Sequence, residues 1–471
     1  MIEGLKPYAE YKESGLPWLD AVPKHWDMAP NRALMRDQRQ VVGSMASDYT
    51  LLSLTLRGVI ARDMVNPKGK FPARFNTYKM VNPDDFVFCL FDIDETPRGV
   101  GLSPLKGMIT GAYDVFSPTP RINPRFLYHY YLFVDEGKLM KPLYTGLRKT
   151  IQRGVFASLK APLPPPEEQA AIVRFLDHAN RKIDGFIRAK RKLIGLLNEQ
   201  KQAIIHRAVT RGLDPNVPLK PSGIPWLGDI PEHWDTPLLG RCLTRIEQGW
   251  SPVGAEGELG ERQWCVLTLS AVRRGVFNPE AIKPVSTLAD IPRDIEVANG
   301  DLLLTRSNTR DRVGDVCLAK DVRPRTLLCD LIYRLTLGGG GFVPQFLVYQ
   351  LLCPMGRAQI EKDARGSSET MPKISQSHIK SWRVLLPPPE EQQAIVELVA
   401  IECRPLTTAI ARTEREIALM LEYRTRLTAD IVTGKLDVRA AAENLPEIPS
   451  ESVAEEAFEG IEDESFSQVE L

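Results

Sequence analysis

The chain has 471 residues, which at roughly 100–200 residues per domain allows two to four domains. Its apolar fraction of 43% is ordinary for a globular protein, and no apolar run reaches the ~18 residues that span a membrane. The net charge of zero hides a segregation of charge. Residues 28–162 hold 19 Lys and Arg against 11 Asp and Glu, residues 236–385 hold 20 against 16, and ten acidic residues follow Arg439. Two basic blocks favour a polyanionic partner.

The seven cysteines are scattered and form no C-x-x-C pair. This spacing argues against a zinc site and against a disulfide framework. It favours buried, reduced thiols and a cytoplasmic location, and we expect no metal ion in the chain.

Two pairs of duplicated segments divide the chain into similar halves. The segment SGLPWLDAVPKHWD at 14–27 recurs 208 residues later as SGIPWLGDIPEHWD at 222–235. The segment LPPPEEQAAIV at 163–173 recurs 223 residues later as LPPPEEQQAIV at 386–396. The blocks between these segments show no clear alignment with each other. A period this long indicates a two-fold pseudosymmetric protein and not a solenoid.

The duplication predicts five parts along the chain, each half combining a Trp/Pro motif, a variable block and a long helix. In chain order they are residues 1–162 (Trp/Pro motif and first α/β domain), 163–214 (first long helix), 215–385 (repeated motif and second α/β domain), 386–438 (second long helix) and 439–471 (an acidic tail, predicted to be disordered).

Both variable blocks contain the same kinds of element in the same order. Residues 81–91 and 297–306 each indicate a turn that leads into a strand. Residues 123–133 and 342–352 each indicate a helix that begins at a proline. The shared order predicts that the two blocks have one mixed α/β fold despite their dissimilar sequences.

Each LPPPEEQ segment is expected to start a long helix. Three prolines suit the entry of a helix, and the two following glutamates fall in its first turn, where the helix dipole favours negative charge. Apolar residues then alternate at spacings of three and four over about 44 residues, or roughly 65 Å. Pro405 should kink the second helix.

Because one helix cannot bury such a stripe alone, we expect the two helices to pair as an antiparallel coiled coil, although the spacing does not exclude a parallel pair. The predicted seam residues, also candidates for partner docking, are Ile172, Leu176, Ile183, Phe186, Leu193, Leu197, Ile204, Ile395, Val399, Leu406, Met420 and Leu427.

The duplicated G-[LI]-P-W-L-x-x-[VI]-P-x-H-W and LPPPEEQ-x-A-I-V motifs, with the endings AVTRGLD and DIVTGKLD, resemble the specificity subunits of Type I restriction-modification systems. The resemblance covers residues 8–438. It implies two target recognition domains, each of which reads one half of a bipartite double-stranded DNA sequence, and helices that set the half-site spacing. It also implies two adenine-methyltransferase (modification) subunits and further restriction subunits as partners, in a bacterial or archaeal cytoplasm.

The resemblance implies a noncatalytic subunit, with S-adenosylmethionine, ATP and magnesium bound only by the partner subunits. The sequence agrees, because it contains no phosphate-binding loop of the form G-x-x-x-x-G-K-[ST] and no adenine-methyltransferase signature. His25 and His233 recur in the Trp/Pro motifs, but a histidine beside Trp and Pro is expected to be packed or capping and not catalytic.

Basic and amide side chains in loops beside strands are the candidates for DNA contact, because Lys and Arg bind phosphates and polar side chains read base edges. In the first block they are Arg57, Arg62, Lys68, Arg148, Lys149, Gln152 and Arg153. In the second block they are Arg306, Ser307, Asn308, Arg310, Arg312, Arg365, Ser367, Ser368, Lys373 and Gln376.

Apolar residues off the seam widen the stripe of each helix beyond what a two-helix seam needs, which favours docking of partner subunits over a thicker core. They are Phe175, Ile187, Ile194, Ile205, Ile410, Ile417 and Leu421. The competing interpretation is a noncatalytic coiled-coil scaffold that joins two protein-binding modules, and binding to mixed duplex DNA distinguishes the two.

Overall fold

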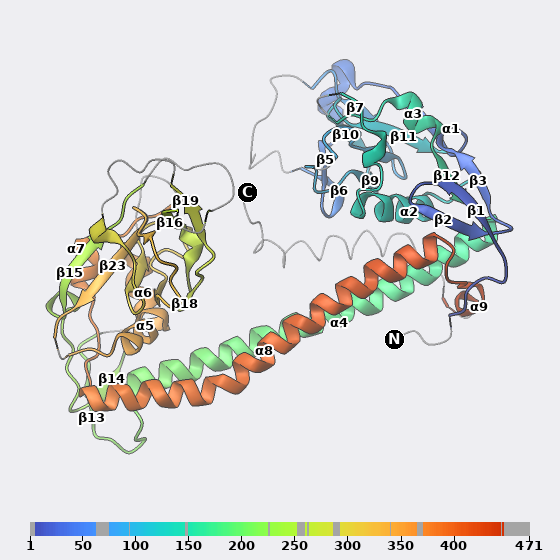
Figure 1. Cartoon of the computed structure of the whole chain (residues 1–471). Helices are drawn as coiled ribbons and strands as arrows, with labels where there is room; N and C mark the ends of the chain where they lie inside the picture. The colour runs from blue at the N-terminus through green and yellow to red at the C-terminus, as the bar shows by residue number, and fades with distance from the viewer. Residues whose placement is uncertain are drawn as a thin grey trace. The chain divides into compact units, whose positions relative to one another are not determined.

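The computed structural model describes residues 5–62, 75–93, 95–146, 149–224, 227–251, 260, 263–285, 293–339, 341–364, 371–443 and 445–446. The chain forms two compact units. Unit 1 comprises residues 1–190 and 415–471, and unit 2 comprises residues 191–414. The two long helices are α4 (Pro166–Arg211) and α8 (Pro389–Val432), drawn in green and in orange in Figure 1. One end of each helix belongs to unit 1 and the other end belongs to unit 2.

The domain of unit 1 is built on a four-stranded antiparallel sheet of order β4-β11-β8-β9. Its strands are β1 (Tyr11–Leu16), β2 (Leu19–Pro23), β3 (Asp27–Pro30), β4 (Met35–Gln38), β5 (Leu52–Thr55), β6 (Gly58–Ala61), β7 (Lys79–Val81), β8 (Phe86–Phe88), β9 (Val100–Leu102), β10 (Gly107–Ile109), β11 (Asp114–Pro118) and β12 (Lys160–Leu163). Its short helices are α1 (Asn31–Leu34), α2 (Pro124–Glu136), α3 (Arg153–Ser158) and α9 (Arg439–Ala442), with 3-10 turns at Gly43–Asp48 and Lys141–Leu143.

Unit 2 repeats this plan with an antiparallel sheet of order β15-β23-β20-β21. Its strands are β13 (Leu219–Pro221), β14 (Asp229–Pro231), β15 (Leu243–Gln248), β16 (Cys265–Leu267), β17 (Val272–Arg273), β18 (Val276–Phe277), β19 (Ile282–Pro284), β20 (Leu302–Thr305), β21 (Val316–Leu318), β22 (Thr326–Leu327) and β23 (Ile332–Leu337). Its helices are α5 (Pro344–Leu352), α6 (Pro354–Asp363) and α7 (Gln376–Ser381), with 3-10 turns at Leu239–Arg241, Leu269–Ala271 and Arg293–Ile295.

The two sheets correspond strand for strand, so the prediction of one mixed fold for both variable blocks is confirmed. In unit 1 the helix α2 follows the sheet and begins at Pro124, where the side chain of Asn123 caps two backbone N–H groups. In unit 2 the helix α5 begins at Pro344 in the same place. Burial of one sheet face against this helix provides the hydrophobic stabilisation that each unit needs.

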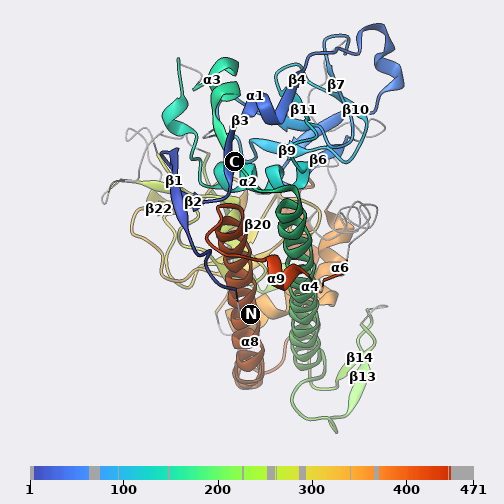
Figure 2. The same cartoon turned by 90° about the vertical axis from the view of Figure 1, so that its right-hand side faces the viewer.

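The helices α4 and α8 run side by side in both views (Figures 1 and 2). Arg424 of α8 pairs with Asp184 of α4, and Lys190 lies 2.7 Å from Glu416. Residue numbers rise along one helix as they fall along the other, which confirms the antiparallel packing. Both helices start at the last proline of their LPPPEEQ segment, as predicted, and α8 continues through Pro405.

The predicted seam is buried only where a domain lies over the helices. Ile172, Leu176, Ile183, Ile395, Val399 and Leu427 are buried, and Leu197, Ile204, Leu406 and Met420 are half-buried. Phe186 and Leu193 are 37% and 40% exposed, so their place in the seam stays a prediction.

None of the helices in the described ranges is long and apolar enough to cross a membrane.

Candidate nucleic-acid interface

The duplicated motifs meet each other in space, which the sequence did not reveal. In unit 1, Glu168 of the first LPPPEEQ segment accepts hydrogen bonds from Trp26 Nε1 and Tyr8 Oη, and it lies 2.8 Å from His25 Nε2. Burial, then the hydrogen bond to Glu168, raises the pKa of Tyr8, so its hydroxyl remains a donor. In unit 2, Glu391 takes the same position, 3.1 Å from Trp234 Nε1 and 2.7 Å from His233 Nε2.

The glutamine that follows each glutamate connects the long helix to the domain. The side chain of Gln169 accepts from the backbone N–H of Asn123 and donates to the carbonyl of Pro164. Gln392 accepts from Val343 and donates to Pro387 in the same way. We call these Trp, His, Glu and Gln side chains the anchor of each unit. The anchors hold both histidines in structural contacts, in agreement with their predicted packed role.

Each sheet carries its candidate DNA-contacting loops at one edge. In unit 1 the backbone N–H of Ile151 donates to the carbonyl of Leu90, which joins the loop between β8 and β9 to the segment 145–152. Lys149 of this segment lies 3.4 Å from Glu95 of the β8–β9 loop, and both side chains are substantially exposed. Through this ion pair the acidic side chain of the β8–β9 loop faces a basic side chain of the segment 145–152.

In unit 2 the equivalent hydrogen bond is donated by the backbone N–H of Ile374 to the carbonyl of Arg306. It joins the loop between β20 and β21, residues 306–315, to the segment 371–376. The side chains of Arg310 and Lys373 are exposed here, and Arg312 and Asn308 are half-buried. We call these joined loops, together with the neighbouring hairpin tip, the loop edge of each unit.

The hairpin tips are a further part of each loop edge, and Arg57 at the first tip was among the predicted DNA contacts, whereas the tip of unit 2 was not predicted. The turn Leu56-Arg57 joins β5 and β6, and the turn Arg274-Gly275 joins β17 and β18. Arg98 donates to the carbonyl of Leu56, and the N–H of Arg274 donates to Asp315, so each tip contacts the end of its neighbouring loop. A short shared Arg-Gly-Val sequence was the available signal, but a three-residue match does not stand out in blocks of this length.

The structure separates the predicted DNA-contacting residues into groups. Arg57, Gln152, Arg310 and Lys373 are exposed. Arg62, Arg306, Asn308, Arg312 and Gln376 are half-buried, and Lys149 keeps its contact with Glu95. Lys68, Arg148, Arg365, Ser367 and Ser368 lie outside the described residues.

Two of the predicted contacts have another role in the structure. Ser307 is fully buried and its hydroxyl donates to the carbonyl of Pro372, so it holds the two loops together and cannot reach a duplex in this conformation. Arg153 pairs with Asp114 and lies 3.7 Å from Asp37, which places its charge between two carboxylates of the sheet. Sequence reasoning recognised the donors but not the partners that strands from distant segments supply.

The predicted docking residues divide in a similar way. Phe175 and Ile187 are buried, and Phe175 packs in the core of unit 1, so it covers the domain instead of widening an exposed stripe. Leu421 is exposed, and Ile194, Ile205, Ile410 and Ile417 are half-buried. Exposed leucines that were not predicted, Leu196 and Leu419, add to this surface.

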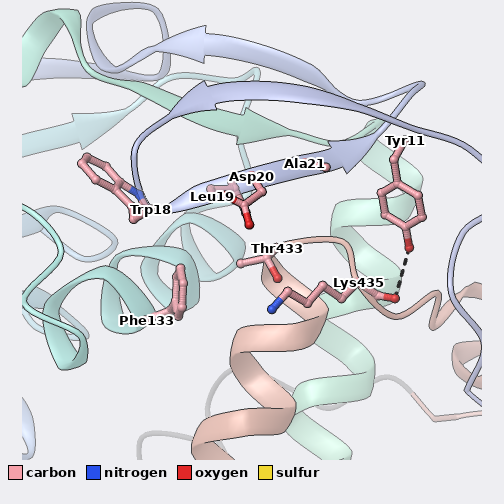
Figure 3. A pocket seen from close by; sticks show the side chains of 8 residues that line it. All are labelled: Tyr11, Trp18, Leu19, Asp20, Ala21, Phe133, Thr433 and Lys435. Carbon is pink, nitrogen blue, oxygen red and sulfur yellow. Dashed lines mark hydrogen bonds between the residues drawn. The ribbon is translucent and has the colours of Figure 1, made fainter.

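A hollow of about 300 Å³ lies in unit 1 where the β1–β2 hairpin, α2 and the end of α8 meet (Figure 3). Tyr11 Oη donates to the carbonyl of Lys435 across its mouth. Its wall is mainly apolar and is formed by Tyr11, Trp18, Leu19, Asp20, Ala21, Phe133, Thr433 and Lys435. Within the described part of the chain, no group of three or more His, Cys, Asp and Glu is arranged to hold a metal ion.

Comparisons with known proteins agree with this arrangement. Residues 111–193 match the family model for the Type I restriction modification DNA specificity domain. The chain is 26% identical to the EcoKI specificity subunit of Escherichia coli K12 over 467 residues, 94% of this chain and 96% of that one. It is 24% identical to the EcoEI specificity subunit of Escherichia coli over 210 residues. The aligned parts span only 35% of the EcoEI subunit and 65% of the MjaVIII specificity subunit of Methanocaldococcus jannaschii.

Among solved structures, one reported for complex assembly and conformational transition of a type I R-M system shares the fold. It has a TM-score of 0.55 at 16% identity, over 88% of this chain and 99% of that one.

The sheets with their matching loop edges and the matched family model make the chain similar to proteins that carry a DNA specificity domain. More specifically, it is similar to specificity subunits of Type I restriction-modification systems, along nearly its whole length in the EcoKI comparison and over a smaller part in the EcoEI comparison.

Proposed function

We propose that this chain is the noncatalytic specificity subunit of a Type I restriction-modification complex. Each unit reads one half of a bipartite sequence in double-stranded DNA, and α4 and α8 set the distance between the half-sites. The helices also dock two adenine-methyltransferase subunits and, through them, the restriction subunits. The partner subunits, and not this chain, bind S-adenosylmethionine, ATP and magnesium.

The observation that carries this proposal is the duplicated loop edge. Each unit has the same four-stranded sheet, the same anchor on a long helix, and loops joined by an equivalent backbone hydrogen bond. The scaffolding elements recur while the loops differ, with Glu95 on one edge and Arg310 on the other. Two equivalent frames with different loops suit a target made of two different half-sites, because base edges are distinguished by donor and acceptor patterns.

The helix surface supports the docking part of the proposal. Ile401 is 68% exposed, Leu419 is 58% exposed and Leu196 is 53% exposed, so large apolar side chains face solvent on both long helices. Exposed large apolar side chains gathered along one element mark a site of protein association more often than scattered ones do.

The experiment that tests the proposal is single-molecule methylation mapping of host DNA with and without this gene. We expect one two-part adenine-methylated motif to disappear on deletion and to return on complementation. If the deletion changes no methylated motif although the methyltransferase gene is expressed, the proposal fails. Binding of the purified chain to mixed-sequence duplex DNA then separates the scaffold, which would not bind, from a DNA-binding protein without a methylation role.

A further inference from the structure

Each hairpin tip carries an exposed arginine next to a glycine. Arg-Gly-Val occurs at 57–59 and 274–276, and the same triplet also occurs away from the tips at 98–100 and 153–155. A Cβ added at Gly58 would lie 3.8 Å from Tyr128 Oη of α2, and one at Gly275 would lie 3.0 Å from Leu352 Cδ1 of α5. Each tip therefore approaches the helix that follows the sheet of its unit.

Turn chemistry explains the glycines but not the arginines. Gly58 and Gly275 have φ of +95° and +86°, a region that favours glycine. Arg274 itself has φ +43°, where Asn, Asp or Gly would be the usual choice in a two-residue hairpin turn. An arginine held at such a position suggests that its side chain is required there.

Arg57 and Arg274 are exposed, and no side-chain ion pair holds either of them within the described ranges. The carboxylates of Asp311 and Asp315 nevertheless lie close enough to interact with the charge of Arg274. In contrast, Arg153 and Arg334 are held by carboxylates of their own unit. The two tips also touch the loops proposed to read bases, through Leu56 in unit 1 and Asp315 in unit 2.

The two loop edges share a positive charge at the hairpin tip and differ in the side chains of their other loops. Half-sites of different sequence differ in their base edges but present the same phosphate backbone. The loops beside the tips have different side chains in the two units, whereas each tip carries one exposed arginine. A positive charge present on both tips suits the part of the ligand that both half-sites have in common.

We therefore infer that Arg57 and Arg274, the exposed arginines of the two hairpin tips, are phosphate-binding residues, one for each half-site, which position the neighbouring loops on the bases without reading sequence. This inference rests on the proposed function, because it assumes that both units bind duplex DNA.

The test uses the full chain with Arg57→Ala, Arg274→Ala and the double substitution. Affinity is measured at several salt concentrations on a duplex carrying the mapped motif and on a duplex with both half-sites scrambled. We expect each substitution to weaken binding to both duplexes and to reduce the slope of log affinity against log salt by about 0.9, because one phosphate contact is lost. The ratio of the two affinities stays as in the unsubstituted chain, and Arg57→Lys and Arg274→Lys restore most of the slope.

Lys160→Ala in unit 1 and Arg241→Ala in unit 2 are matched controls, because they remove one exposed positive charge from elements outside the loop edges. Thermal melting of every variant detects unfolding, and Arg57→Gln and Arg274→Gln provide substitutes if an alanine variant melts early.

An unchanged salt slope in a chain that prefers its motif overturns the inference and leaves the proposed function intact. Weakening on the motif duplex alone, without rescue by lysine, also overturns it and assigns these arginines to base reading. If the unsubstituted chain shows no preference for any two-part sequence, the proposed function fails instead.

Discussion

At the scale of single residues, one buried carboxylate determines how each domain is attached to its helix. Glu168 gathers Trp26, Tyr8 and His25, which lie about 140 to 160 residues earlier in the chain. Its counterpart Glu391 has two of these three partners and is more exposed. Hydrogen bonds to a charged acceptor are stronger than neutral ones, and each donor that loses its acceptor in a buried site costs free energy.

Glu168→Ala should therefore lower the free energy of unfolding by about 2–4 kcal/mol, because the Trp26, Tyr8 and His25 donors lose their acceptor. Glu391→Ala should cost less, since fewer donors depend on it and water reaches them. Urea denaturation of the full chain, followed by tryptophan fluorescence, measures both. Glu167→Ala is the control, because its exposed side chain has the same charge one residue away. Equal effects of Glu167→Ala and Glu168→Ala would contradict this account.

Residue types were easier to predict than residue environments. The loops around Arg57, Arg310 and Lys373 were found from composition alone, and these side chains are exposed. The sequence did not show that Ser307 faces inward or that Arg153 meets Asp37 and Asp114, because those partners come from other strands. Arg274 was not predicted, because its place at a hairpin tip between β17 and β18 becomes visible only in the structure.

At the scale of elements, local signals were sufficient where a helix or strand is determined by its own residues. The proline-led starts of α2, α4, α5 and α8 follow from backbone geometry. The correspondence of the two sheets followed from element order and not from sequence identity. Contacts between elements were harder to predict: Phe186 and Leu193 of the predicted seam are 37% and 40% exposed, and the amino group of Lys190 lies over the Phe186 ring.

The two glycines of α4 permit a prediction at this scale. A Cβ added at Gly185 or Gly195 would meet no atom within 4 Å outside the backbone of its own helix, so neither glycine is needed for close packing within the chain. Gly185→Ala and Gly195→Ala should each stabilise the helix by about 0.5–1 kcal/mol, because alanine loses less backbone entropy than glycine on folding. Thermal melting measures the gain.

Capture of the methyltransferase subunit is the second readout for these variants. A stabilised chain that still captures the subunit is the expected result. Loss of capture with unchanged melting would instead show that a partner approaches α4 closely at these positions. Lys192→Ala, an exposed substitution between the two glycines, controls for a general effect of altering this face.

At the scale of the whole chain, the two units are assembled from the same parts joined in different ways. In unit 2 the end of α4 continues directly through Asp214 into the repeated Trp/Pro motif. In unit 1 the end of α8 meets the first Trp/Pro motif without a covalent link, through a hydrogen bond from Asp437 N–H to the carbonyl of Lys6. By the two offsets of the repeat, Lys6 and Asp437 both correspond to residue 214. Hydrogen bonds from Arg439 lower the pKa of Asp437 and keep this junction charged.

Charge balance is the other property of the whole chain, and it leads to a prediction about residues 447–471. These residues hold nine Glu and Asp and no Lys or Arg, so their removal changes the formal net charge from zero to +9. Association with DNA depends on the summed field of the protein, and this field is screened by salt. Truncation after Pro446 should therefore accelerate association with any duplex at 50 mM salt, and the gain should shrink at 200 mM.

Stopped-flow association with the motif duplex and the scrambled duplex measures this effect at both salt concentrations. The methylated motif itself should not change, because the truncation removes no loop-edge residue. A chain of full length with these nine acidic residues replaced by Gln or Asn separates charge from length, and it should behave as the truncated chain does. If the truncated chain associates faster and the neutralised chain does not, the acidic residues act through their length or through a specific contact. If neither chain changes, the negative charge after Arg439 does not oppose DNA binding, and the two basic blocks bind DNA independently of it.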